Sequence, residues 1–155
     1  MELYQVDHRG SLFISPTIDN WDPIGQLTID AVFNLDCDLD ENIPEVMNQT
    51  LYIFFPFEDR YLPDLKKLHA LARLGASLIE SGHQVLCHCG MGHNRSALLA
   101  GLILTYLGFD GNEAVRLLRE KRQGALYNKT FATYLESIPA AVITSALERP
   151  ITLFQ

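Results

Sequence analysis

The residues whose types and spacing suit them for chemistry lie between positions 85 and 101, in the stretch VLCHCGMGHNRSALLAG. The apolar run at its start predicts a buried strand, and the apolar residues after Ser96 predict a helix. A loop that contains two glycines begins at Cys89 and ends at Arg95. This order places a thiol where the strand ends and a guanidinium where the helix begins.

Such a loop is suited to bind a tetrahedral oxyanion. The first N–H groups of a helix have no internal partner and lie at the positive end of the helix dipole. We expect Gly90 and Gly92 to adopt the positive φ angles that turn further N–H groups inward. Arg95 can bind two phosphate oxygens at once, and Cys89 below it is expected to ionise to a nucleophilic thiolate. The residues predicted to surround the anion are Gly90, Met91, Gly92, His93, Asn94 and Arg95.

This stretch resembles a known family. His88-Cys89, then five residues, then Arg95-Ser96 is similar to the signature loop of the cysteine-dependent protein tyrosine phosphatases, and the surroundings are most similar to the small atypical dual-specificity branch. The resemblance covers roughly residues 11–138. It implies hydrolysis of a phosphate monoester through a phosphocysteine intermediate, with no cofactor and no metal ion.

The reaction also needs an acid that protonates the leaving oxygen. The segment PFEDRYLP, residues 56–63, follows a predicted strand and therefore lies on the same rim of the sheet as Cys89. We expect Asp59 to be this acid, with Glu58 and Asp64 as alternatives. The segment also resembles the acid loop of the family, in which an aspartate lies between two prolines. The alternative is that Asp59 is only a solvated turn residue.

Two neighbours of the thiol have alternative roles. Ser96 either donates a hydrogen bond to the sulfur of Cys89 and eases its departure in the second step, or caps the helix N-terminus. In the family, the residue at the position of His88 is buried and orders the loop. A zinc site formed by Cys87, His88, Cys89 and His93 is disfavoured, because the spacing is compressed and no second cluster of ligands exists.

The remaining cysteines have simpler interpretations. Cys87 is expected to be a small buried residue of the strand. Cys37 is expected in an acidic surface loop at residues 36–45. A further hypothesis is that Cys37 forms a disulfide with Cys89 after oxidation.

The pattern along the chain predicts the fold. Strands alternate with helices, which favours an α/β fold with three layers: a mostly parallel central sheet flanked by helices. Residues 1–10 are polar, and residues 19–22 form a turn or cap around Trp21, which is expected to be a packing anchor. The predicted strands are 11–14, 31–35, 51–55 and 84–89, and the predicted helices are 63–81, 96–107, 113–122 and 128–139, with a further helical stretch to Leu147.

Composition limits the classes of function. With 155 residues, 48% of them hydrophobic and 20% charged, the chain is expected to form one globular domain over residues 1–155 and to be a monomer. A net charge of −7 disfavours nucleic acids and anionic membranes as partners. Three cysteines without a signal peptide predict a cytoplasmic location.

The variable loop positions bear on the substrate. Lipid and inositol-phosphate relatives of the family place Lys or Arg there, and this chain has none, although His93 beside an anion can become cationic. Met91 and Tyr61 offer apolar surface to an aromatic ring. The expected substrates are therefore phosphotyrosine on proteins, with phosphoserine or phosphothreonine, or a small phosphate ester.

Several other functions remain as alternatives. Two are phosphatases for a different substrate, a phosphoinositide or an RNA 5′ end. A non-catalytic phospho-binding module is disfavoured because Cys89, Arg95 and Asp59 are all present. A rhodanese-type sulfurtransferase or an arsenate reductase is disfavoured. Arsenate-reducing relatives place the loop near the N-terminus and the acid after it, whereas this chain has the loop in mid-sequence and the acid before it.

Overall fold

The residues that the structure describes form one five-stranded, mostly parallel sheet. The computed structural model describes residues 1–45 and 48–140. The strand order is β1-β2-β5-β3-β4. Strand β1 runs antiparallel to β2, and the other three neighbouring pairs are parallel. The strands are β1 Tyr4–Gln5, β2 Leu12–Ser15, β3 Ala31–Asn34, β4 Leu51–Phe54 and β5 Val85–His88.

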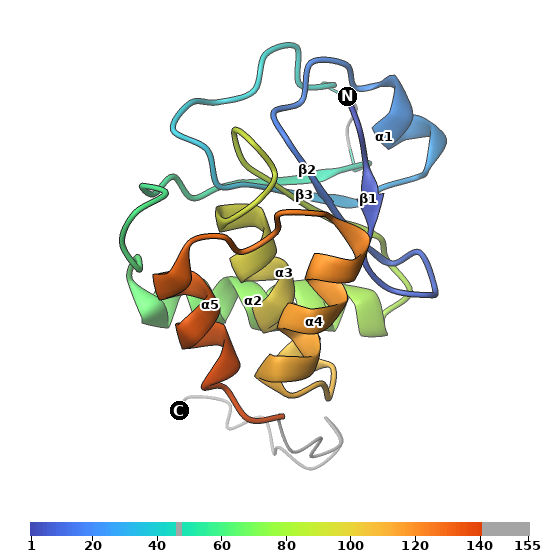
Figure 1. The fold of residues 1–155 in the computed structure, drawn as a ribbon. Helices are drawn as coiled ribbons and strands as arrows, with labels where there is room; N and C mark the ends of the chain where they lie inside the picture. The colour runs from blue at the N-terminus through green and yellow to red at the C-terminus, as the bar shows by residue number, and fades with distance from the viewer. Residues whose placement is uncertain (46–47, 141–155) are drawn as a thin grey trace, which may run out of the picture.

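Helices cover both faces of the sheet, so the predicted three-layer α/β fold is confirmed (Figure 1). Helices α2 to α5 lie on one face and the short helix α1 lies on the other. Neighbouring strand residues alternate between the two resulting cores: Ile14 and Phe33 pack on the four-helix side, whereas Phe13 and Val32 pack on the α1 side. The helices are α1 Asp22–Gln26, α2 Leu65–Glu80, α3 Arg95–Tyr106, α4 Gly111–Lys121 and α5 Lys129–Glu136.

Strand β5 lies at the centre of the sheet and determines where the site forms. His88 is in register with Ser15 of β2 and with Asn34 of β3. The carboxyl ends of three parallel strands therefore meet at one edge, where α/β folds place their ligands. Cys89 is the first residue beyond that edge.

Helix α3 begins after the loop and passes through the larger core. Every residue from Arg95 to Thr105 in this helix is buried. The neighbouring helix α5 packs closely because Gly101 has no side chain: a Cβ atom there would lie 2.2 Å from Cδ2 of Leu135. The guanidinium and the thiol are thus supported by the most enclosed helix and the central strand.

Two elements differ from the sequence predictions. Strand β1 lies within residues 1–10, which were expected only to be polar, and α1 begins at Asp22 inside the predicted turn. Trp21 is a packing anchor as predicted: its ring centroid lies 6.2 Å from that of Tyr52, and its indole N–H donates to the carbonyl of Glu41. The helical stretch predicted up to Leu147 extends into residues that lie outside those described.

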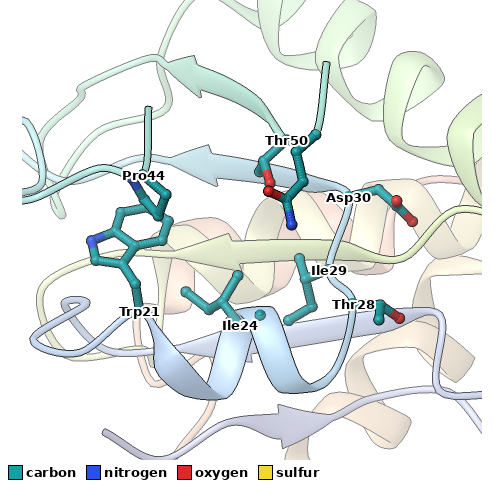
Figure 2. A pocket seen from close by; sticks show the side chains of 9 residues that line it. Trp21, Ile24, Thr28, Ile29, Asp30, Pro44 and Thr50 are labelled. Atoms are coloured by element: carbon teal, nitrogen blue, oxygen red, sulfur yellow. The ribbon is translucent and has the colours of Figure 1, made fainter. Parts of the chain in front are cut away.

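A cavity of about 240 Å³ lies on the α1 face of the sheet. Figure 2 shows Trp21, Ile24 and Ile29 on one side of it, with Pro44 and Thr50 opposite. None of the predicted catalytic residues lines this cavity. Within residues 1–45 and 48–140, no helix is long and apolar enough to cross a membrane.

Candidate active site

The loop between β5 and α3 is closed tightly against the end of β2. Gly92 has a φ of 68°, and a Cβ atom there would lie 2.6 Å from the backbone N of Pro16. Glycine is therefore required at this position. The same prediction for Gly90 is wrong, because its φ is not positive. Gly90 instead faces Asp36, whose carboxylate oxygens would lie 3.3 and 3.4 Å from a Cβ atom.

The predicted nucleophile lies at the base of this loop. Cys89 is buried, and its Sγ donates to Oγ of Ser96 at 3.4 Å. Ser96 is the second residue of α3 and is fully buried. The N-cap of α3 is Asn94, so the alternative that Ser96 caps the helix is wrong. The hydroxyl is thus placed to contact the sulfur and not the helix terminus.

The guanidinium of Arg95 is anchored along one edge. Its Nη1 donates to the carbonyl oxygens of Leu35 and Phe57 at 3.2 and 3.1 Å and lies 3.3 Å from Oδ1 of Asp36. Its buried Nε has no hydrogen-bond partner among the described residues, and Nη2 would lie 3.5 Å from a Cβ on Gly90. The edge formed by Nε and Nη2 is therefore available to a ligand of the loop.

The charge state of Arg95 reflects two opposing effects. Burial of the guanidinium acts to lower its pKa, but the negative charges of Cys89 and Asp36 outweigh burial, and the pKa is raised overall. The side chain is therefore a permanent cation. It lies 9% exposed at the base of the site, where its charge is weakly screened by water.

The predicted acid is tied to the loop through asparagines. Oδ2 of Asp59 accepts a hydrogen bond of 3.0 Å from Nδ2 of Asn94, and the carbonyl of Asp59 accepts one from Nδ2 of Asn128 at 3.3 Å. Of the alternative acids, Asp64 caps helix α2, and Glu58 makes no hydrogen bond to the loop within the described residues. Asp59 is exposed and lies in a bend, as the alternative states, but its carboxylate is in addition hydrogen-bonded to the loop.

The rim of the loop is partly aromatic. His93 packs against Tyr127 with a centroid distance of 5.8 Å, and its Nε2 lies 3.2 Å from Nη2 of Arg122. Burial and then the charge of Arg122 lower the pKa of His93, so its ring is neutral near pH 7 in the free protein. Met91 in the loop and Tyr127 beside His93 are 65% and 62% exposed and present apolar surface, and Tyr61 in the Asp59 segment is 64% exposed.

A buried polar network lies directly below the loop. Nε2 of His88 lies 2.6 Å from Oδ2 of Asp40, which also accepts a hydrogen bond of 2.7 Å from the hydroxyl of Tyr52. The Tyr52 hydroxyl accepts in turn from Nδ2 of Asn34. His88 is fully buried, as the family resemblance implied. The predicted surface loop at 36–45 is confirmed, since most of its residues are exposed, but the side chain of Asp40 is an exception at only 2% exposed.

The remaining cysteines have different environments. Cys87 is fully buried in β5 as predicted, and burial, followed by the charge of Cys89, raises the pKa of its thiol strongly. Cys37 is exposed, and its Sγ accepts from Nη1 of Arg95 at 3.8 Å. The disulfide between Cys37 and Cys89 stays a prediction.

Three contributors were missed in the sequence: the side chain of Asn94, and the carboxylates of Asp36 and Asp40. Asn94 was assigned only to the anion-binding loop, and no sequence signal identifies its link to Asp59. The acidic segment is predicted as one solvated stretch, but it follows the end of β3, which lies beside β5. Asp36 and Asp40 are therefore close enough to contact Arg95 and His88.

The comparison with known families decides the assignment of the chain. The model of the dual specificity phosphatase catalytic domain matches residues 13–138. The chain belongs to this family. The match covers both the Cys89–Arg95 loop and the Asp59 segment, and membership of the family supports phosphatase activity.

Solved structures share the fold at low sequence identity. Human DUSP28 is 19% identical over 86% of this chain and 90% of its own, with a TM-score of 0.73. The human tyrosine phosphatase-like serine/threonine/tyrosine-interacting protein is 18% identical over 86% and 93%, with a TM-score of 0.70. The Yvh1 phosphatase domain from Chaetomium thermophilum is 20% identical over 87% and 94%, with a TM-score of 0.69. No curated protein matches the chain.

Proposed function

We propose that this domain hydrolyses phosphate monoesters on proteins, phosphotyrosine foremost and phosphoserine or phosphothreonine in addition, through a phosphocysteine intermediate. The observation that carries this proposal is the free edge of Arg95. Its buried Nε has no partner in the described residues, and the edge lies beside Gly90, one residue from Cys89. A buried guanidinium edge without acceptors is matched by the oxygens of a phosphate.

In the first step, the thiolate of Cys89 attacks phosphorus and the bond from phosphorus to the ester oxygen breaks. Asp59 transfers its proton to the departing oxygen, so the alcohol or phenol leaves neutral. The loop N–H groups and Arg95 stabilise the negative charge on the three equatorial oxygens, the usual source of catalysis in phosphoryl transfer. A phosphocysteine remains.

In the second step, water attacks the phosphocysteine while the carboxylate of Asp59 accepts its proton. The bond between sulfur and phosphorus breaks, and inorganic phosphate leaves. Cys89 departs as a thiolate, and the Ser96 hydroxyl, 3.4 Å from the sulfur in the free protein, then acts as donor to it. This hydrogen bond stabilises the leaving sulfur and accelerates the step.

The surroundings support an aromatic protein substrate. Met91, Tyr61 and Tyr127 are well exposed, and a phenyl ring can pack on such surfaces. Arg95 is the only Lys or Arg in the loop from 89 to 95, and a phosphoinositide offers further phosphates that would need more cations. We expect no nucleic-acid or membrane partner, and we expect residues 1–155 to act as one monomeric domain in the cytoplasm.

The test is hydrolysis of p-nitrophenyl phosphate by the wild type and by Cys89→Ser, Asp59→Asn and Glu58→Gln. We expect no activity in Cys89→Ser and a loss of about 10²-fold or more in Asp59→Asn. Glu58→Gln removes the adjacent carboxylate and should retain activity, because Glu58 does not contact the loop. Hydrolysis that survives in Cys89→Ser would contradict the proposal.

A second comparison separates the alternatives. A wild type that binds phosphotyrosine peptides without hydrolysing any ester would indicate a non-catalytic phospho-binding module. A higher kcat/KM for phosphoinositides or RNA 5′ ends than for phosphotyrosine peptides would show that the substrate is not a phosphoprotein. Sulfur transfer from thiosulfate, or arsenate reduction, would assign a different thiol enzyme.

A further inference from the structure

A carboxylate lies beside the proposed phosphate site, where it adds negative charge. Oδ1 of Asp36 is 3.3 Å from Nη1 of Arg95. Its two oxygens would lie 3.3 and 3.4 Å from a Cβ on Gly90, the residue after the proposed nucleophile. The side chain is 22% exposed, so part of the carboxylate remains accessible to solvent.

This carboxylate is held in place by its own hydrogen bonds. The backbone N–H of Cys37 donates to Oδ1 at 2.8 Å, and Oγ1 of Thr17 donates to Oδ2 at 3.2 Å. The backbone N–H of Thr17 in turn donates to the carbonyl of Gly90 at 3.3 Å. Asp36 is thus part of the frame of the loop, and its negative charge is fixed relative to an anion bound there.

We propose that Asp36 is a specificity-determining residue, which weakens the binding of anionic phosphate and favours substrates that carry a positively charged group beside the phosphate. This inference rests on the proposed function of the site. A phosphate dianion bound by Arg95 lies close to a fixed like charge, and the repulsion raises the free energy of binding. A cation on the substrate, next to the phosphate, offsets that repulsion and gains an ion pair with Asp36.

The implied substrate class is a phosphoprotein with Lys or Arg adjacent to the phosphorylated residue. In a substrate with Glu or Asp at that position, Asp36 repels both the phosphate and the neighbouring carboxylate, and no cation offsets the repulsion. Discrimination therefore comes from a repulsive element as well as an attractive one.

The first experiment compares Asp36→Asn with Asp38→Asn. Both variants remove one negative charge, but Asp38 is exposed, and its carboxylate makes no hydrogen bond or ion pair within residues 1–45 and 48–140. Asn at position 36 keeps Oδ1 as acceptor for the N–H of Cys37, and its Nδ2 can donate to the Thr17 hydroxyl in place of the bond that Oδ2 accepts. We expect Asp36→Asn to lower both KM for p-nitrophenyl phosphate and the inhibition constant of inorganic phosphate by about threefold to tenfold.

The Asp38→Asn control should change both constants by less than about twofold, because an exposed charge is screened by solvent. Unchanged or raised constants in Asp36→Asn would overturn the inference. An equal decrease in Asp38→Asn would also overturn it, since the effect would then come from overall charge and not from the pair with Arg95.

The second experiment uses two phosphotyrosine peptides that differ only in having Lys or Glu next to the phosphotyrosine. The wild type should show a higher kcat/KM for the Lys peptide, and Asp36→Asn should reduce that preference at least threefold, while Asp38→Asn retains it. An equal preference in wild type and Asp36→Asn would contradict the assignment of specificity to this residue.

Failure of the proposed function can be separated from failure of this inference. If the wild type proves inactive, calorimetric titration of inorganic phosphate into wild type and Asp36→Asn still decides whether the carboxylate weakens anion binding. If the wild type is active and depends on Cys89, but Asp36→Asn binds phosphate as the wild type does, only the inference fails. Absence of phosphate binding in both proteins would overturn both.

Discussion

Nδ2 of Asn94 donates a hydrogen bond of 3.0 Å to Oδ2 of Asp59, which joins the proposed phosphate loop to the proposed acid. The other end of the same amide, Oδ1, accepts the backbone N–H of Asn128 at 2.9 Å. One buried side chain therefore holds three segments together: the segment after β4, the loop before α3 and the segment before α5.

Replacement of Asn94 by Ala should release Asp59 and slow leaving-group protonation. We expect kcat to fall about tenfold for phenyl phosphate, which has a poor leaving group, and less for p-nitrophenyl phosphate, whose phenolate is a better leaving group and depends less on protonation. In the Asp59→Asn background, Asn94→Ala should have little further effect. Equal losses for both substrates would show that Asn94 acts by another route.

Replacement of Gly92 by Ala should disrupt the loop and destabilise the fold. The backbone has a φ of 68°, and the new Cβ would lie 2.6 Å from the backbone N of Pro16, which cannot move aside as a side chain can. We expect a loss of about 2 kcal/mol or more in the free energy of unfolding, measured with urea. Gly25→Ala is the control, because a Cβ at that position in α1 has no neighbour within 4 Å.

The three cysteines should differ in reactivity towards iodoacetamide at pH 7.5. Burial raises the pKa of the Cys87 thiol strongly, so this residue stays protonated and unmodified in the folded protein. Cys37 is exposed, and Cys89, although buried, is the proposed thiolate nucleophile at the base of the loop, so both should be alkylated, and inorganic phosphate should protect Cys89 alone. Mass spectrometry of the digested protein measures each site. Alkylation of Cys87 at the same rate as Cys37 would be inconsistent with the packing of β5.

The free energy of unfolding should depend on pH through His69. Its ring nitrogens lie 2.7 Å from the hydroxyl of Tyr106 and 2.6 Å from that of Tyr134, and burial followed by the charge of Arg73 lowers its pKa below 6.5. The unfolded chain therefore binds this proton more readily than the folded one. The stabilisation by His69 is fully present above pH 6.5 and decreases as the pH falls from 6.5 towards the folded pKa.

Urea unfolding between pH 5 and 8 tests this dependence. At pH 8 we expect His69→Phe to be destabilised by about 1–2 kcal/mol, because two hydrogen bonds to tyrosine are lost. The difference from the wild type should shrink at pH 5. A difference between wild type and His69→Phe that stays constant over this range would rule out the proposed linkage.

The sequence predicted most of the fold because hydrophobic periodicity and helix termini are local signals. Asp110 and Glu113 form a capping box, and Asn128 caps α5, close to where these helices were predicted to begin. Strand β1 was missed because two residues carry no periodic pattern and pair with β2 only through tertiary structure. Helix α1 was missed because it has five residues and Pro23 near its start, which also suits a turn.

The candidate site divides in the same way. The meeting of Cys89, Arg95 and Asp59 was predictable, because the carboxyl ends of parallel strands share one edge of the sheet. The contacts of Asp36 and Asn94 were not, since each depends on the side-chain geometry of residues far apart in sequence. The proximity of Arg122 to His93 was also not predictable, because the two residues are far apart in sequence; the expectation that His93 becomes cationic beside an anion stays a prediction.

The burial of α3 has a consequence for hydrogen exchange and for the loss of activity on heating. Its amides from Arg95 to Thr105 have no local route to solvent, so we expect them to exchange with deuterium only when the whole domain opens. This helix carries Arg95, so the guanidinium of the proposed phosphate loop, the cradle formed by residues 89–95, belongs to the element that opens last. Heating should therefore leave the cradle assembled until the domain itself melts, and any earlier decline in turnover would originate in the exposed rim.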